Sequence, residues 1–288
     1  MRAVGPKTAT RYLVSLKQLA PWLDGRALPD INGRLVAEII RERQKAGVTN
    51  ATIKRDLGAL SSVMNFAILQ SWVEANPVLA KLALVPERRD PILLPTDRDI
   101  ALVMERAPGM VGQMMRAALV TGAREDELAK AKRIDIDHAH RQLTVIGKRN
   151  KLRVIDLTPF DGYESFSALP AYVGKPFLFW HDEGERYSSF APTFHKLMNR
   201  TEVWAKANEV EFRRFAFHHL RHRHAVDWLK SGRDIYTLQK RLGHTSVKTT
   251  EMYLEYLTPQ EVQVAKFGSA VPQKVPQPES RTTAADAS

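Results

Sequence analysis

Basic side chains and one phenol recur between His218 and Tyr253, and this stretch holds the residue types best suited to chemistry. A helix is predicted from Ala216 to Ser231. Its rotation of about 100° per residue places His218 and Arg221 on the same face as its apolar residues. Two polar groups therefore point in the direction of the predicted core.

The next two predicted helices bring further functional groups close by. Residues 234–243 form the first of them, with an aspartate cap at the start and a glycine at the end, and His244 follows directly. Thr245 or Ser246 is predicted to cap the second helix, which carries Tyr253 at the margin of its apolar stripe. A tyrosine at that margin need not belong to the core.

These residue types suit attack by a phenol on a phosphodiester, with cations stabilising the phosphoryl oxygens and acid-base groups moving two protons. Arginine suits the cationic role because its planar fork matches two phosphate oxygens. The alternative is zinc binding by His218 and His222, which are four residues apart. No glutamate completes a His-Glu-x-x-His motif there, so solvated or hydrogen-bonded histidines are favoured and no metal is predicted.

The order of these residues resembles that of the tyrosine recombinases, the phage-integrase family. Any one piece is common, whereas the combination in this order is highly specific. Arg223 and His224 depart from the family, which usually has small residues there. The pattern consists of His218-x-x-Arg221-His222, then Leu242-Gly243-His244, then Tyr253 nine residues after that histidine.

A second part of the resemblance lies upstream, where Thr121-Gly122-Ala123-Arg124 and Glu127-Leu128 are similar to the family's first-arginine motif. Arg124 would begin a helix with an acidic first turn, a position where a cation is unfavourable. A weak surface ion pair with Glu127 would explain it without any function. The resemblance favours the other explanation, in which Arg124 binds an anion and Glu127 orients it.

Further along, short β-rich runs predict a small antiparallel meander. Lys148 and Lys151 fall in its second turn, where polar residues are also common without any function. A lysine with a lowered pKa can act as a general acid, and the resemblance assigns that role to Lys148. Arg149 stands where the family usually has glycine. The runs are Ile134–Asp137, Leu143–Ile146 and Arg153–Leu157.

Residues 1–85 are predicted to be all-helical. A helical bundle with a solvated charged face would share this composition. Resemblance of this region to the core-binding domain of tyrosine recombinases makes Lys54 and Arg55 candidate DNA contacts. The resembling pieces are Thr52-Ile53-Lys54-Arg55, Phe66-Ala67 and Asn76-Pro77. The predicted helices run from Thr8 to Leu23, from Leu35 to Lys45 and from Thr49 or Asn50 to about Trp72, and Asn76-Pro77 ends the last.

The sequence divides into four predicted segments. They are a helical core-binding domain at 1–85, a charged linker at 86–95, a catalytic domain at 96–258 and a partly disordered tail at 259–288. A short apolar stripe in residues 259–270 is predicted to dock on a neighbouring protomer. The resemblance spans residues 8–258 and implies a mainly α fold with a small antiparallel β-sheet. It combines a SAM-like helical domain with a mixed α/β catalytic domain of the tyrosine recombinase or type IB topoisomerase type.

Composition narrows the possible partners. The chain has 288 residues, a formal net charge of +11 and no cysteine. The charge favours a polyanionic partner but does not by itself distinguish DNA from RNA or a membrane surface. The absence of cysteine excludes disulfides and thiolate metal sites. We find neither a signal peptide nor an apolar run long enough to span a bilayer, and expect a cytoplasmic, nucleoid-associated protein of a bacterium or phage.

The resemblance implies a site-specific DNA recombinase that needs neither ATP nor a metal. Its implied partners are double-stranded DNA, contacted also by Arg149 and Lys151, and three further copies of the chain on paired sites. The residues before Thr8 are too few for the arm-binding domain that many phage integrases carry, so we expect either a simple recombinase or a truncated chain. The implied roles are attack by Tyr253 to form a 3′-phosphotyrosine, phosphate clamping by Arg124 and Arg221, leaving-group protonation by Lys148, and assistance from His218 and His244.

Two alternatives remain open at this point. A type IB topoisomerase would use the same covalent chemistry to relax DNA. A non-catalytic DNA-binding regulator would keep the positive charge but would not need Tyr253.

Overall fold

The computed structural model describes residues 5–86, 92–147 and 150–268, and the chain divides into two compact units, Met1–Pro91 and Ile92–Ser288. The division falls inside the range predicted as a linker. Lys148 and Arg149, for which roles are predicted above, lie outside the described residues.

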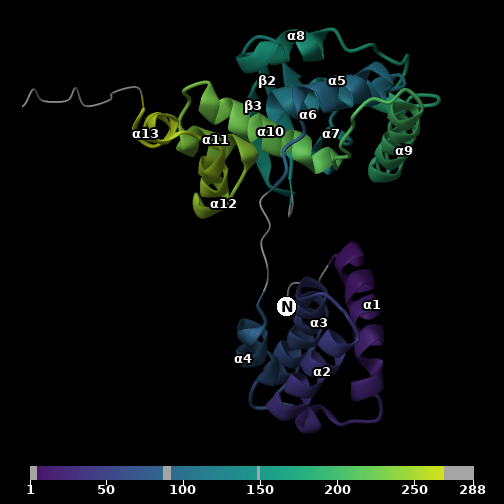
Figure 1. Cartoon of the computed structure of the whole chain (residues 1–288), viewed down its shortest axis with the longest axis vertical. Helices are drawn as coiled ribbons and strands as arrows, with labels where there is room; N and C mark the ends of the chain where they lie inside the picture. Colours follow the sequence, from purple (N-terminus) through teal and green to yellow (C-terminus); the bar gives the residue numbers. More distant parts are fainter. Residues whose placement is uncertain (1–4, 87–91, 148–149, 269–288) are drawn as a thin grey trace, which may run out of the picture. The chain divides into compact units, whose positions relative to one another are not determined.

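The first unit consists of helices packed around one apolar core (Figure 1). The first helix starts earlier than predicted, because Pro6 suits the first turn of a helix. Asn76 does more than end a helix, since its side chain accepts a hydrogen bond from the backbone of Val78 and caps a fourth helix. The elements are α1 (Pro6–Leu23), a 3₁₀ turn (Leu28–Asp30), α2 (Gly33–Lys45), α3 (Asn50–Leu69) and α4 (Pro77–Leu84).

A buried ion pair joins three helices of this unit. Nη2 of Arg43 on α2 lies 2.6 Å from Oδ2 of Asp56 on α3, and Nη1 of Arg43 donates to the carbonyl oxygen of Gln18 on α1 at 3.0 Å. Removing one partner of such a pair leaves an uncompensated buried charge. The pair therefore fixes α3, the helix that carries Lys54 and Arg55, against its neighbours.

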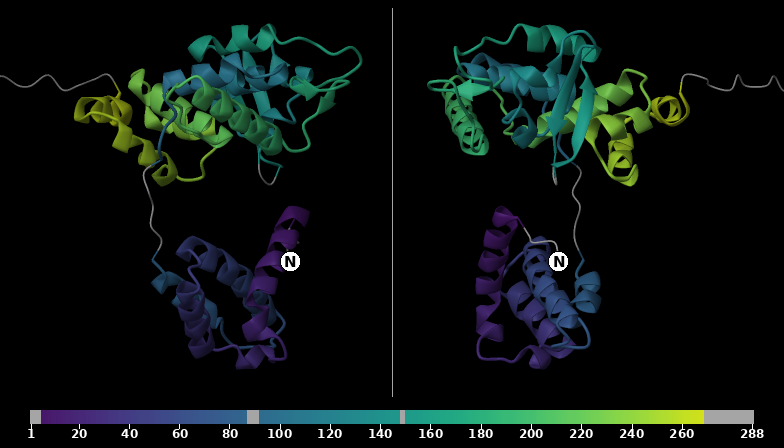
Figure 2. Two further views of the ribbon diagram at one scale, coloured as in Figure 1. Left: turned by 45° about the vertical axis from the view of Figure 1, so that its right-hand side comes forward. Right: turned by 180° about the vertical axis from the view of Figure 1, so that it is seen from behind.

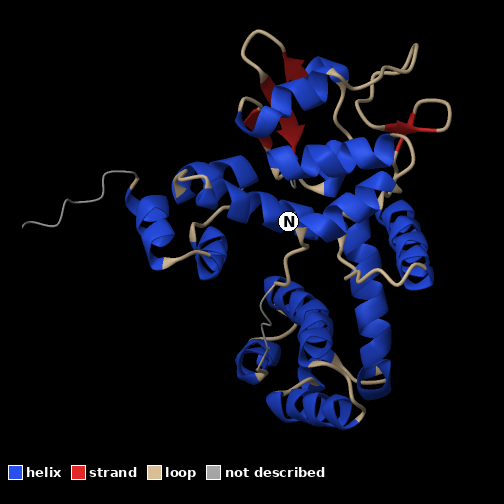
Figure 3. Ribbon diagram, turned by 45° about the horizontal axis from the view of Figure 1, so that its top comes forward, coloured by secondary structure: helices blue, strands red, loops and turns tan. Residues whose placement is uncertain are grey.

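The second unit is mainly helical with two small antiparallel sheets, as the colours of Figure 3 show. This confirms the predicted mainly α fold with a small antiparallel sheet. None of the described helices is long and apolar enough to cross a membrane. The helices are α5 (Asp97–Glu105), α6 (Met110–Thr121), α7 (Glu125–Leu128), α8 (Gly162–Ser167), α9 (Ala191–Ala207), α10 (Phe217–Lys230), α11 (Ile235–Leu242), α12 (Lys248–Glu251) and α13 (Pro259–Phe267). The strands are β1 (Ile136–Asp137), β2 (Gln142–Ile146), β3 (Leu152–Asp156), β4 (Trp180–His181) and β5 (Glu185–Arg186).

The predicted meander is present, with strand order β1-β2-β3 and both pairs antiparallel. Figure 2 shows β2 and β3 side by side in its right-hand view. Leu143 pairs with Ile155 in the register, and both side chains are buried. The first strand is shorter than predicted, because residues 133–135 form a 3₁₀ turn in which Asp135 accepts a hydrogen bond from the backbone of Lys132.

Helix α10 connects the two cores of the second unit. Phe217 and Leu220 at its start belong to the core that α6 and the sheet share, whereas Trp228 and Leu229 near its end pack with α11. Because the helix is covered along most of its length, its buried surface is wider than the single predicted face. Polar residues on α10 are therefore held by surrounding structure on several sides.

The C-terminal part differs from prediction at the segment that carries Tyr253. The helix predicted from residue 246 is broken into α12 and a 3₁₀ turn, Met252–Tyr256, which carries Tyr253. Residues 259–267 of the segment predicted to dock on another protomer form α13, which contacts α10 and α11 of its own chain and buries Ala265. Docking on another protomer stays a prediction. Its start is fixed by a capping box between Thr258 and Glu261.

Gly122 ends α6 and offers a test of how tightly the unit is packed. Its φ is +65°, and a Cβ there would lie 2.5 Å from Cδ2 of His224 and 2.7 Å from Cδ2 of Leu242. We expect Gly122→Ala to lower the free energy of unfolding by more than about 2 kcal/mol, because left-handed strain adds to overpacking. Chemical denaturation measures the loss.

Gly47→Ala is the matched control for this prediction. Gly47 follows the end of α2 with φ +75°, but a Cβ there would meet nothing within 4 Å. That variant should lose only about 1–2 kcal/mol from the left-handed backbone conformation. Equal losses for the two variants would contradict the packing argument.

Candidate active site

The turn after α6 positions Arg124 at the start of α7. The backbone N–H of Arg124 donates to Oε2 of Glu127 at 2.7 Å, and its Nη1 donates to Oε1 at 2.9 Å. Glu127 is only 2% exposed, so this is no solvated surface pair. The carboxylate therefore fixes both the backbone and the guanidinium of Arg124.

Arg153 on β3 holds the same carboxylate from the other side. Its Nη1 and Nη2 donate to the two oxygens of Glu127 at 2.5 and 2.8 Å, a bidentate pair. Burial raises the pKa of Glu127, but the hydrogen bonds and charge of Arg153, together with Arg124, outweigh this and hold the pKa at about 2. Glu127 is thus ionised at neutral pH and bridges two cations.

Sequence reasoning missed Arg153 as a site residue. Strand alternation was the available signal, because it places Arg153 on the same face of β3 as the buried Ile155. An arginine on an inward-facing strand position indicates a buried partner. Arg153 also donates through Nε to the carbonyl oxygen of Arg241 at 2.9 Å, which ties β3 to the end of α11.

Arg221 on α10 is buried between two helix ends. Its Nη1 donates to the carbonyl oxygen of Gly122 and its Nη2 to that of Leu242, both at 2.6 Å. Burial lowers its pKa to about 9, helped by the charges of Arg124 and Arg153, so the guanidinium stays protonated at neutral pH. Three guanidinium groups thus lie close enough to repel one another.

His244 follows Gly243, which ends α11 in the left-handed conformation as predicted. Nε2 of His244 lies 3.1 Å from Nη2 of Arg221, and Nδ1 lies 2.9 Å from Oγ1 of Thr250. Since a guanidinium only donates, Nε2 accepts and Nδ1 carries the proton. Burial, then the charge of Arg221, lowers the pKa of His244 to about 4, so the ring is neutral at pH 7.

Tyr253 is buried, with 1% of its surface exposed, and does not lie at the margin of a core. Its Oη lies 2.8 Å from Nδ1 of His222 on α10. The break between α12 and the following 3₁₀ turn directs the phenol toward α10 instead of along a continuous helix stripe. Burial raises the pKa of Tyr253, although the charges of Arg221 and Arg124 oppose this.

His218 is brought near this cluster but is exposed. Its ring stands edge-on to that of His222, with centroids 4.6 Å apart. Loss of hydration lowers its pKa, followed by the charges of Arg221 and Arg124. Within the described part of the chain, no three histidine, aspartate or glutamate side chains are grouped so as to hold a metal ion.

A cavity of about 550 Å³ gathers several of these residues. Arg124, Arg153 and His244 line it, and so does Lys151, whose carbonyl accepts from the backbone of Gly147 to close the turn. Lys54 and Arg55 belong to the first unit, where Arg55 lines a separate pocket with Arg11. Lys148 and Arg149 remain predictions, because the structure does not describe them.

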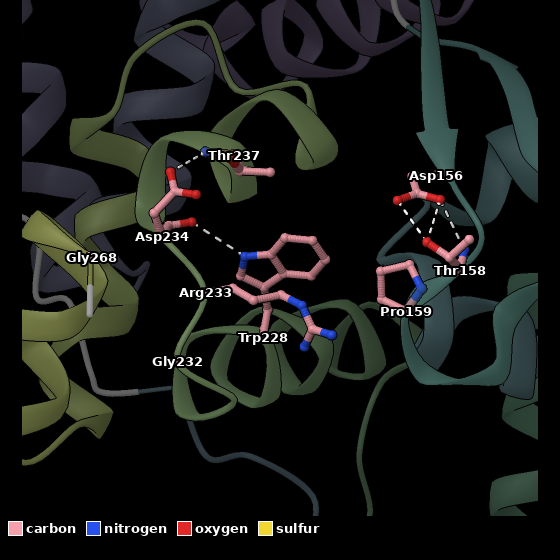
Figure 4. A pocket seen from close by; sticks show the side chains of 9 residues that line it. All are labelled: Asp156, Thr158, Pro159, Trp228, Gly232, Arg233, Asp234, Thr237 and Gly268. Atoms are coloured by element: carbon pink, nitrogen blue, oxygen red, sulfur yellow. Dashed lines mark hydrogen bonds between the residues drawn. The ribbon is translucent and has the colours of Figure 1, made fainter. Parts of the chain in front are cut away.

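A second cavity, of about 530 Å³, lies between the end of α10 and the turn after β3. Figure 4 shows Arg233 between the ring of Trp228 and the β3 turn. The guanidinium lies 5.0 Å from the Trp228 ring centroid. None of the predicted site residues lines this cavity.

Comparison with known proteins defines the class of this chain. Residues 105–258 match the phage integrase family, and residues 1–71 match the N-terminal SAM-like domain of phage integrases. The chain therefore belongs to the phage integrase family. It is an enzyme of the tyrosine recombinase class, whose members carry out site-specific recombination.

Individual relatives agree with this assignment. Tyrosine recombinase XerC of Chlamydia muridarum is 25% identical over 286 residues, covering 88% of this chain and 89% of the relative. Tyrosine recombinase XerD of Bifidobacterium longum is 27% identical over 273 residues, covering 88% of this chain and 87% of the relative.

Among solved structures, a lambda integrase dimer bound to a COC′ core site aligns with a TM-score of 0.69 at 22% identity, covering 88% of this chain and 89% of that chain. The Tn1549 transposon integrase in complex with a circular intermediate DNA aligns with a TM-score of 0.71 at 17% identity, covering 90% and 92%. These two likenesses confirm the fold.

Glu127 provides a test of the site's electrostatics. Its folded-state pKa lies below its ordinary value of 4.5, so the ionised carboxylate stabilises the fold above about pH 4.5 and this contribution is lost as the pH falls toward 2. We expect Glu127→Gln to lower the free energy of unfolding at pH 7 by about 3 kcal/mol, since one pKa unit corresponds to about 1.4 kcal/mol. Urea unfolding at pH 7 and pH 3 measures the loss, which should shrink at the lower pH.

Asp126→Asn is the control for this prediction. Asp126 neighbours Glu127 on α7 but is exposed, so its loss should stay within about 0.5 kcal/mol. If Glu127→Gln cost no more than Asp126→Asn at pH 7, the carboxylate would not hold the arginines in place.

Proposed function

We propose that this chain cleaves and rejoins double-stranded DNA at specific sites through a covalent 3′-phosphotyrosine intermediate. The observation that carries the proposal is the convergence of Arg124, Arg153 and Arg221 around a single carboxylate, Glu127. Three cations with one buried counter-charge leave positive charge for an anion to neutralise. A phosphodiester fits this need, and the cavity beside Arg124 and Arg153 provides the space.

The proposed reaction exchanges one phosphodiester for another. The Oη of Tyr253 forms a bond to phosphorus, the bond from phosphorus to the 5′-oxygen breaks, and the 5′-oxygen leaves as a hydroxyl after it takes a proton. Arg124 and Arg221 neutralise the developing charge on the non-bridging oxygens. Attack by a 5′-hydroxyl on the phosphotyrosine reverses the steps, so neither ATP nor a metal cofactor enters the proposal.

The remaining roles follow the family pattern. Lys148 is proposed to protonate the leaving 5′-oxygen, and His218 and His244 to assist at the phosphate. His244 accepts a hydrogen bond from Arg221 through Nε2, so in this scheme it assists by orienting the guanidinium that binds the phosphate. Glu127 is a positioning residue in this scheme, because it touches the arginines and not the reacting atoms.

Duplex DNA and further copies of the chain are the proposed partners. The net charge of +11 supports binding to a polyanion, and Lys54, Arg55, Arg149 and Lys151 are proposed phosphate contacts. One solved structure similar to this chain is a lambda integrase tetramer bound to a Holliday junction. We propose that this chain also forms a tetramer on paired sites. We further propose that it acts on DNA in the cytoplasm of its host.

Tyr253→Phe tests the nucleophile. The variant keeps the ring that packs in the core and removes only the attacking oxygen, so duplex affinity should stay within about threefold of wild type while covalent adducts disappear. The substrate is a nicked duplex selected from a random pool for binding. Denaturing gel electrophoresis measures the covalent adduct, and native gel electrophoresis measures the non-covalent complex.

Tyr256→Phe is the matched control. Tyr256 lies on the same 3₁₀ turn, and its hydroxyl donates to the carbonyl of Ile92 away from the arginines. Its adduct yield should match wild type. A denaturant-stable adduct from Tyr253→Phe would disprove the assignment of the nucleophile.

The leaving-group acid is tested with a duplex that carries a 5′-bridging sulfur at the cleaved bond. A thiolate leaves without protonation, so this substrate should restore cleavage by Lys148→Ala to within about tenfold of wild type. Lys151→Ala serves as the comparison, since Lys151 is in the same turn and lines the cavity. Selective rescue of Lys151→Ala, measured as single-turnover adduct formation, would move the role to that residue.

A further inference from the structure

A histidine outside the predicted set contacts the attacking atom. His222 follows Arg221 on α10, and its Nδ1 lies 2.8 Å from Oη of Tyr253. The two ring centroids are 5.6 Å apart. Among the described residues, His218 and His244 make no hydrogen bond to that phenol. The group within reach of the phenolic proton is therefore His222.

The direction of this hydrogen bond follows from the charge state of His222. Burial lowers its pKa to about 3, and the charges of His218, His219, Arg221 and His244 add to the effect. The ring is therefore neutral at pH 7, with one nitrogen free to accept. Because the pKa of Tyr253 is raised by burial, the phenol is protonated and acts as the donor. Nδ1 of His222 thus accepts, and its Nε2 carries the ring proton.

We propose that His222 is a catalytic residue that takes the phenolic proton of Tyr253 during cleavage and returns it during rejoining. The proposal rests on the proposed function. As the Oη to phosphorus bond forms, the proton moves from Oη to Nδ1 and the ring becomes an imidazolium. When the 5′-hydroxyl attacks and the Oη to phosphorus bond breaks, the same proton returns to Oη.

Bound DNA supplies the condition that this proton transfer needs. In the free protein at pH 7, burial and the charge of Arg221 disfavour an imidazolium at His222. A phosphodiester placed against Arg221 and Arg124 adds a negative charge beside the two guanidinium groups. This charge offsets their repulsion of a protonated His222. The basicity of His222 therefore rises when the substrate is in place, and a proton acceptor forms only next to a phosphate that can be attacked.

Two substitutions at His222 separate proton transfer from packing. His222→Phe keeps a ring but removes the acceptor. His222→Asn places an amide oxygen near the position of Nδ1, so it keeps a hydrogen-bond acceptor that does not take up a proton at neutral pH. We expect both variants to bind the selected nicked duplex like wild type and to form the covalent adduct about 10²–10⁴-fold more slowly at pH 7.

The pH profile of single-turnover adduct formation is the decisive readout. Without a base, the rate should depend on the ionised fraction of the phenol and rise about tenfold per pH unit up to about pH 9, so the deficit shrinks as pH rises. Wild type should show a flatter profile. The 5′-bridging sulfur substrate should not rescue either variant, because the missing proton transfer is at the nucleophile.

His219→Phe is the matched control, since His219 lies on the same helix with its ring centroid 6.0 Å from that of His222. It should keep the wild-type rate within about threefold and the wild-type pH profile. Wild-type rates for both His222 variants, or a slow rate that does not recover with pH, would overturn the proposal. Absence of adduct from wild type itself would instead disprove the proposed function.

Discussion

The buried carboxylate of Glu127 determines how the site can be built. Arg124, Arg153 and Arg221 lie close enough for their charges to affect one another, and like charges in a poorly hydrated interior repel strongly. Glu127 accepts two hydrogen bonds from Arg153 and two from Arg124, one of these from its backbone. It thereby offsets part of the repulsion and sets the geometry of both side chains. The excess positive charge that remains is what a phosphate would neutralise.

Backbone carbonyls, most of them at helix ends, stabilise Arg221 and Arg241. Arg221 donates to carbonyl oxygens at the ends of α6 and α11. Arg241 donates to the carbonyls of Val120 and Asp156 and to Nε2 of His224. The carbonyls of a last helical turn carry partial negative charge, which suits a guanidinium. The buried His224, where the family usually has a small residue, is accommodated because Gly122 leaves space for its ring.

Local signals in the sequence predicted much of the fold, because they act over a few residues. Asp234 and Gly243 bound α11 as expected, and the β-rich runs gave the meander. Contacts between distant segments were not predictable in this way. Arg153 and Glu127 are 26 residues apart, and His222 and Tyr253 are 31 apart. The burial of Tyr253 likewise depends on α10 packing against a turn whose break no local pattern indicated.

The central claim is that the phenol of Tyr253, held beside this arginine cluster, becomes bonded to DNA. The protein is trapped on a nicked duplex and the DNA is digested with nuclease. Peptide mass spectrometry then identifies the modified residue directly. We predict a nucleotide attached through its 3′-phosphate to the peptide that contains Tyr253, with fragment ions that place it on that side chain. Attachment to another residue, or release of both DNA ends without any attached protein, would contradict the claim.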